Sequence, residues 1–193
     1  MSSQLAPKVS NREFGGSVKV AQRQNPDRNR VLWGGILAGL GLGGFFDGIV
    51  LHQILQWHHM VSNVYPVTTV AGLRVNTLGD GLFHAATYVF VVTGLLLLWS
   101  VGRRSHVVWP AGLLIGALLT GWGLFNVVEG VVDHHILQVH HVRGGPNQLA
   151  YDLAFLCWGA AMLVGGWVLV RRGLSQVSAE KDKTIPPTDR SKH

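Results

Sequence analysis

The chain has 193 residues, of which 48% are hydrophobic and 13% are charged, and its mean hydropathy is +0.27. This composition is too apolar for an ordinary soluble domain and indicates a membrane protein. The formal net charge of +6 does not indicate nucleic-acid binding, because the basic residues lie in flanking segments and one short loop rather than on one helix face. The single cysteine, Cys157, excludes an intramolecular disulfide and a cysteine-rich zinc site.

Four apolar stretches follow one another along the chain. Each is close to the ~20 residues that a helix needs to cross a bilayer, and none alternates with the period of two that a membrane β-barrel requires. The stretches are residues 31–55, 82–101, 107–128 and 153–170. The sequence therefore predicts an all-α integral membrane four-helix bundle, with residues 31–172 as the transmembrane domain. The polar, basic segments 1–30 and 173–193 are predicted to be disordered tails.

The distribution of lysine and arginine predicts the orientation in the membrane. These residues precede the first stretch, follow the fourth stretch, and occur between the second and third as Arg103 and Arg104. The other two connections contain only Arg74 and Arg143. Because lysine and arginine are enriched in cytoplasmic loops, we expect a multi-pass protein of the cytoplasmic membrane with both termini in the cytoplasm and residues 59–79 and 142–151 outside.

One sequence pattern occurs twice, at an offset of 82 residues (47 to 129). The run DGIVLHQILQWHH at 47–59 returns as EGVVDHHILQVHH at 129–141, and a weaker echo pairs Asp80 with Asp152. This recurrence predicts two helix hairpins in the same orientation, related by an axis along the membrane normal. Membrane proteins often place such parallel repeats around a shared site.

Ionisable side chains concentrate at the predicted outer ends of the four helices. Such groups cost about 2.5–3.5 kcal/mol each inside a spanning helix on insertion scales, so they indicate pairing, a cavity or a bound ligand. Antiparallel threading brings them to one level, and carboxylates with imidazoles but no thiolate suit iron, manganese, zinc or copper(II). The candidate metal ligands are Asp47, His52, His58, His59, Asp80, His84, Glu129, His134, His135, His140 and His141.

Distances along an ideal helix divide these candidates into two sets. The polar stripes from residue 47 to 59 and from 129 to 141 extend ~10–17 Å along the helix axis, which is too far for one ion to bind every member. We expect one site, mononuclear or dinuclear, on Asp47, His52, Asp80, His84, Glu129 and His134. A shallower outer position would then use His58, His59, His140 and His141.

The motifs at residues 47–59, 79–84 and 134–141 resemble those of a bacterial family of predicted four-helix membrane proteins catalogued as a domain of unknown function. The resemblance covers about residues 30–172 and implies the membrane architecture but no activity. The histidine clusters also resemble the boxes of membrane desaturases and hydroxylases. Their spacing differs, however, and the predicted side of the membrane is opposite, so we do not adopt that function.

The leading hypothesis is a membrane protein that binds a transition metal for handling, delivery or redox use. One alternative is a metal-dependent membrane oxidoreductase or hydrolase with Glu129 as base, and another is a b-type haem protein with His52, His84 or His134 as axial ligands. A structural polar network and a proton or ion pathway are further alternatives. The inner, predicted cytoplasmic halves of the four helices are apolar, however, and this disfavours a continuous polar pathway. The expected partner is the lipid bilayer, and a homo-oligomer or a metal-handling or respiratory membrane partner stays open.

Overall fold

The computed structural model describes residues 12–104 and 109–183, with side chains described for residues 27–104 and 109–177. The described residues form helices and connecting segments and contain no strand, which confirms the predicted all-α class. The elements in chain order are α1 (Arg12–Phe46), η1 (Asp47–Ile54), α2 (Val70–Gly102), α3 (Ala111–Glu129), η2 (Gly130–Ile136) and α4 (Gln148–Lys183). The segments η1 and η2 are π-helices that directly continue α1 and α3.

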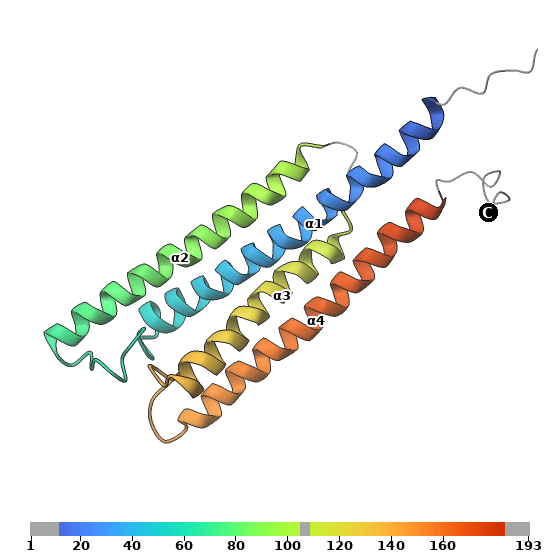
Figure 1. Cartoon of the computed structure of the whole chain (residues 1–193). Coiled ribbons are helices and arrows are strands. Elements are labelled where there is room, and N and C mark those ends of the chain that lie inside the picture. Colours follow the sequence, from blue (N-terminus) through green and yellow to red (C-terminus); the bar gives the residue numbers. More distant parts are fainter. Residues whose placement is uncertain (1–11, 105–108, 184–193) are drawn as a thin grey trace, which may run out of the picture.

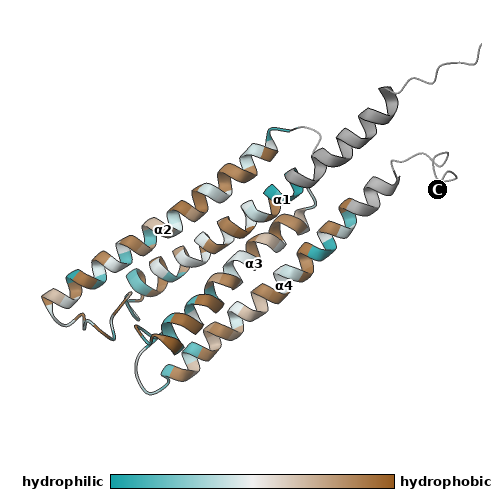
Figure 2. Cartoon of the chain, in the orientation of Figure 1, coloured by the Kyte–Doolittle hydropathy of each residue, from teal (hydrophilic) through white to brown (hydrophobic). Residues whose placement is uncertain are grey.

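Four helical segments of the described chain are long and apolar enough to cross a membrane, as the sequence predicts. They are Asp27–Ile54, Val70–Gly102, Ala111–Ile136 and Gln148–Val177. Hydrophobic residues occur along all four helices (Figure 2). Because lipid offers no hydrogen bonds to the backbone, a helix satisfies these groups internally and is the expected form of such a segment.

The helices extend beyond the predicted boundaries. Helix α2 begins at Val70, well before the predicted start at residue 82, because the side chain of Thr69 caps it by accepting a hydrogen bond of 3.0 Å from the Gly72 amide. Helix α1 begins at Arg12 and α4 continues to Lys183, so both extend into segments predicted as disordered tails. Residues 1–11 and 184–193 of those tails lie outside the described residues.

The helices are arranged side by side in the order α2, α1, α3, α4 (Figure 1). Helices α1 and α3 pack against each other at the centre, while α2 packs on α1 and α4 packs on α3. The hydrophobic windows of the central spans are 56% and 44% buried, compared with 11% and 22% for α2 and α4. The two outer helices therefore turn most of their apolar surface away from the protein, as expected for contact with lipid.

Two glycines allow α1 and α3 to cross at close range. A Cβ atom on Gly39 would lie 2.0 Å from the carbonyl oxygen of Leu118, and one on Gly121 would lie 2.0 Å from that of Ile36. No side chain fits at such distances, so the crossing depends on small residues, as in many membrane helix pairs. The two contacts are reciprocal, because 39 and 121, like 36 and 118, differ by 82.

The two ends of the molecule differ in character. At one end lie the first turns of α1, the last turns of α2 and α4, and the first turn of α3 (Figure 1). There the buried Asp27 accepts a hydrogen bond from Arg104, and the Nη1 atom of Arg30 lies 3.7 Å from its carboxylate. At the other end the connections 55–69 and 137–147 follow η1 and η2. Most of the predicted ligands lie at this second end.

Candidate metal centre

The π-helical geometry brings an acid and a histidine onto one face in each half of the chain. In an α-helix, residues five positions apart point about 140° away from each other, whereas a π-helix bonds residue i to i+5 and aligns them more closely. As a result, Nε2 of His52 lies 3.0 Å from Oδ2 of Asp47. In the second half, Nε2 of His134 lies 3.5 Å from Oε1 of Glu129.

The chain then turns back after each π-helix and adds a second histidine. Gln56 and Gln138 both have φ 50°, a left-handed conformation that is uncommon for residues other than glycine and that ends the helical path. The reversal brings Nε2 of His58 to 3.7 Å from Oδ1 of Asp47. It also brings Nε2 of His140 to 3.2 Å from Oε1 of Glu129.

The two connections are tied to each other by reciprocal hydrogen bonds. Nδ1 of His58 donates to the carbonyl oxygen of Val142 over 2.9 Å, and Nδ1 of His140 donates to that of Met60 over 2.9 Å. The two imidazole rings stack, with centroids 4.6 Å apart and an angle of 9° between their planes. Each connection therefore holds the histidine of the other connection in place.

Six side chains meet at this end of the bundle, and we call them the buried cluster. Each is at most 6% exposed. Among the residues that the structure describes, two groups of side chains have potential ligand atoms that all lie within 4.8 Å of one another. The first group is Asp47, His52 and His58, and the second is His58, Glu129, His134 and His140. The buried cluster is the union of these groups: Asp47, His52, His58, Glu129, His134 and His140.

Several polar atoms of the buried cluster lack a hydrogen-bond partner among the described residues. They are both carboxylate oxygens of Asp47, Nε2 of His52, Nε2 of His58, Oε2 of Glu129 and both ring nitrogens of His134. Leaving a buried polar group unpaired costs about 1–3 kcal/mol, so native structures seldom leave one without an explanation. The chemistry of these nitrogen and oxygen atoms fits a metal ion, which could pair with several of them at once.

The hydrogen bonds around the cluster determine which nitrogen faces inward. Asp80 Oδ1 accepts from Nδ1 of His52 over 2.9 Å, and a backbone carbonyl accepts from Nδ1 of His58. Neither acceptor can donate, so the proton of each neutral ring lies on Nδ1 and the Nε2 lone pair faces the cluster. Nε2 of His52 and Oδ2 of Asp47 are close but not aligned for a hydrogen bond. Two such lone-pair atoms repel each other unless a proton or a cation lies between them.

His58 and His140 lie beyond the spanning segments and differ in their pKa values. Burial lowers the pKa of His58, and this effect outweighs the raising effect of the Asp47 carboxylate. Burial also acts to lower the pKa of His140, but the hydrogen bond to Glu129, the charges of Glu129 and Asp47, and the hydrogen bond to the Met60 carbonyl together outweigh it, so the pKa is raised. His58 is therefore a neutral lone-pair donor. His140, whose two nitrogens both face acceptors, needs a proton or a metal ion on Nε2.

Two further buried acids, Asp80 and Asp152, lie next to the cluster, and we call them the orienting acids. Asp80, on α2, accepts four hydrogen bonds, from Nδ1 of His52, Nε2 of Gln53, Nδ1 of His59 and the amide of Met60. Asp152, on α4, accepts from Nδ1 of His141 and the amide of Val142, and Nδ1 of His134 lies 3.6 Å from it. Carboxylates in this position typically orient metal-binding imidazoles.

The structure divides the candidate ligands differently from the sequence-based expectation. His58 and His140, expected in a shallower position, lie in the buried cluster, whereas Asp80 lies around it. His84 instead bonds through Nδ1 to the carbonyl of Asp80 and stacks on Phe45. The difference arises because the ideal-helix spacing applies neither to a π-helix nor to the reversal that follows it.

The remaining candidates also lie outside the buried cluster. His135 is exposed and bonds through Nδ1 to the carbonyl of Gly130, while His59 and His141 bond to the orienting acids. Asp152 was not among the candidate ligands of the sequence analysis. Its echo of Asp80 at the start of the following helix was the signal that could have identified its role.

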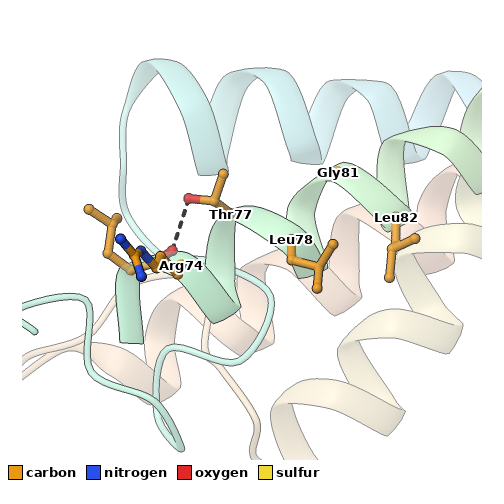
Figure 3. Close-up of a pocket in the computed structure, with 6 residues that line it drawn as sticks. Arg74, Thr77, Leu78, Gly81 and Leu82 are labelled. Carbon is orange, nitrogen blue, oxygen red and sulfur yellow. Dashed lines mark hydrogen bonds between the residues drawn. The ribbon is translucent and has the colours of Figure 1, made fainter. Parts of the chain in front are cut away.

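The hollow that Figure 3 draws lies elsewhere, on the surface of α2. It has a volume of about 560 Å³ and is lined by Leu73, Arg74, Thr77, Leu78, Gly81 and Leu82. All of these residues come from one helix, which cannot enclose a ligand, and the side chain of Thr77 is already bonded to the carbonyl of Leu73 over 2.9 Å. We therefore assign the chemistry to the buried cluster and not to this surface.

The fold and the cluster together define a class: a helical membrane protein with four candidate spans and buried carboxylate and histidine side chains at one end of the bundle. Within this class, the chain belongs to the family described as Predicted membrane protein (DUF2243), whose model matches residues 34–173. The match includes every residue of the buried cluster and confirms the family resemblance expected from the motifs. No curated protein and no solved structure matches the chain.

Proposed function

We propose that this protein binds a transition metal within its membrane domain, through the buried cluster. The observation that carries the proposal is the set of unpartnered nitrogen and oxygen atoms that converge from η1, η2 and the two connections. A metal ion would satisfy these atoms together, and it would supply the positive charge that facing lone pairs require. The function is metal handling, delivery or redox use.

The chemistry of the donors supports a transition metal rather than calcium or magnesium. Four imidazoles and two carboxylates supply the ligand atoms, and imidazole is a characteristic ligand of iron, copper and zinc. The only cysteine, Cys157, is exposed on α4 and does not join the cluster. The orienting acids Asp80 and Asp152 supply the outer hydrogen bonds that metal-binding histidines commonly have.

Geometry favours a metal ion over the alternatives. The axial candidates His52 and His134 each have another imidazole close by, with centroids 4.4 Å apart for His52 and His58 and 4.9 Å apart for His134 and His140, which leaves no room for a porphyrin between the rings of either pair. The third axial candidate, His84, lies outside the cluster and bonds to the carbonyl of Asp80. A purely structural network would satisfy its own hydrogen bonds, whereas this cluster leaves many unmade. Its burial favours metal binding or electron transfer over an enzyme that admits a large substrate.

We also infer that the buried cluster faces the outside of the cytoplasmic membrane. Basic residues concentrate beyond the opposite end of the bundle, and lysine and arginine mark the cytoplasmic side. A reporter that is active only in the cytoplasm, fused after Lys183, tests the orientation. Activity of this fusion is expected. Activity of a periplasm-specific reporter at the same position would overturn the orientation without affecting the metal proposal.

The metal proposal is tested by elemental analysis of protein purified in detergent. The double variant His52→Ala, His134→Ala removes one ligand from each half and is expected to lose the metal. A matched control, His84→Ala with His135→Ala, also removes two histidines at this end but leaves the buried cluster intact. It should keep the metal content of the parent protein.

Equal trace-level metal in parent, variant and control would contradict the proposal and favour a structural polar network. Circular dichroism and size-exclusion chromatography show whether each variant is folded. If the alanine variant does not fold, the variant Asp47→Asn, Glu129→Gln keeps the side-chain shapes while weakening the anionic ligands. It is then expected to lose most of the metal.

A further inference from the structure

We infer that the buried cluster holds two divalent metal ions, one in each half of the chain, and this inference rests on the proposed metal-binding function. The first half-site consists of Asp47, His52 and His58. The second half-site consists of Glu129, His134 and His140. In both, the acid and the first histidine are five positions apart and the second histidine follows six positions later.

Each half-site has a donor set that is complete for one ion. Two histidines and one carboxylate bind non-haem iron(II) in many oxygenases and zinc in several hydrolases. Each half-site obtains this set from one π-helix and the connection that follows it. Three protein ligands leave at least one coordination position for a small ligand such as water. Each half-site therefore suits a divalent first-row ion.

A single ion cannot bind all six residues. Nitrogen and oxygen ligands lie about 2.0–2.2 Å from zinc, so two ligands of one ion are at most about 4.4 Å apart. The potential ligand atoms fall within 4.8 Å of one another only in two overlapping groups, which share His58. His58 offers only Nε2, because its Nδ1 donates to Val142. His58 can therefore bind an ion in one group or the other, but it cannot bring the ligand atoms of both groups onto a single ion.

The ring positions support two neighbouring ions. Within the half-sites the imidazole centroids are 4.4 Å apart for His52 and His58 and 4.9 Å apart for His134 and His140. Across the half-sites they are 5.9 Å apart for His52 and His140 and 6.2 Å apart for His58 and His134. One pair across the half-sites is closer: the stacked rings of His58 and His140, whose centroids are 4.6 Å apart. This pair lies where the first half-site meets the second.

The charge at this end of the bundle also matches two divalent ions. Four buried carboxylates lie in or around the cluster. The carboxylates are Asp47, Asp80, Glu129 and Asp152. Buried charge is stable only when it is balanced. Two divalent ions supply four positive charges, which is as many negative charges as these four carboxylates carry when they are ionised.

Metal titration of the full-length protein in detergent tests the inference. Metal-free protein is loaded with Zn²⁺ and separately with Co²⁺, and bound metal is counted per chain after removal of the excess. The parent protein is expected to bind two ions. His52→Ala and His134→Ala should each retain one ion, the double variant should retain none, and the control His135→Ala should retain two.

The outcomes distinguish this inference from the proposed function. One ion per chain in the parent, lost in both single variants, would overturn the two-ion inference and leave metal binding intact. No bound ion in the parent would overturn both. Should the single variants fail to fold, electron paramagnetic resonance of the Cu²⁺-loaded parent provides the test. Magnetic coupling between two close ions is expected, and a spectrum of isolated copper would overturn the inference.

Discussion

The first and second half-sites have the same residue spacing but different surroundings. In the first, Asp80 accepts four hydrogen bonds and holds Nδ1 of His52 at 2.9 Å. In the second, Asp152 accepts two hydrogen bonds, and Nδ1 of His134 lies 3.6 Å away, beyond hydrogen-bond distance. The two halves thus repeat the same ligand residues but do not hold them with the same number of hydrogen bonds. The first half-site is the more firmly oriented of the two.

The difference in hydrogen bonding between the half-sites originates partly at one pair of equivalent positions, Gln53 and His135. Gln53 follows His52 and donates to Asp80 through Nε2 over 3.1 Å. His135 follows His134 and bonds instead to the carbonyl of Gly130 on its own helix. Oriented ligands lose less freedom when the ion binds. We therefore expect the first half-site to bind its ion more tightly than the second.

The largest effect is expected where the two halves meet. Replacing Gly39 or Gly121 by leucine would force side-chain atoms into the carbonyl of Leu118 or Ile36. Overpacking typically costs about 1–3 kcal/mol and sometimes more, and a clash with backbone is at the upper end. We expect each variant to lower the free energy of unfolding by at least ~3 kcal/mol in detergent-based unfolding measurements.

The two glycine variants should be similar in severity, because the crossing is reciprocal. Gly165→Leu is the matched control, since nothing lies within 4 Å of a Cβ at that position, and its stability should stay close to that of the parent. A stable Gly39→Leu protein with unchanged metal content would contradict the close crossing of α1 and α3.

An intermediate effect is expected from the orienting acids. Losing such an outer hydrogen-bond partner typically weakens metal binding by about 10–100-fold. Asp80→Asn should fall in this range, because four hydrogen bonds converge on Asp80. Asp152→Asn should weaken binding by about 10-fold or less. Competition with a chelator of known affinity measures both, and a larger loss in Asp152→Asn would reverse the proposed ranking of the half-sites.

The smallest effect is expected at the equivalent positions beside the ligands. Gln53→Ala removes one donor to Asp80 and should weaken metal binding only by about 3–5-fold, consistent with the loss of one modest hydrogen bond. His135→Ala should leave affinity unchanged, because its ring bonds to the local backbone outside the cluster. If the parent, Gln53→Ala and His135→Ala have equal metal affinities in the same chelator competition, Gln53 does not contribute to tighter binding at the first half-site.

Hydropathy was sufficient to predict the helical class and the four spans. Lipid forces every buried backbone group to bond within its own segment, so a long apolar stretch such as that in α4 has little alternative to a helix. The boundaries were less predictable. Helix α2 begins at Val70 because Thr69 caps it, and a single capping hydrogen bond has no signature in hydropathy.

The sequence by itself determined that acids and histidines gather at one end of the membrane domain, because polar residues in lipid have few alternatives. Only the tertiary structure decided which of them meet. An ideal helix would separate Asp47 from His58 by about 16 Å along its axis, yet the ligand atoms lie 3.7 Å apart. The π-turns and the reversals at Gln56 and Gln138 close that distance, and they depend on contacts between the two connections that a single helix lacks.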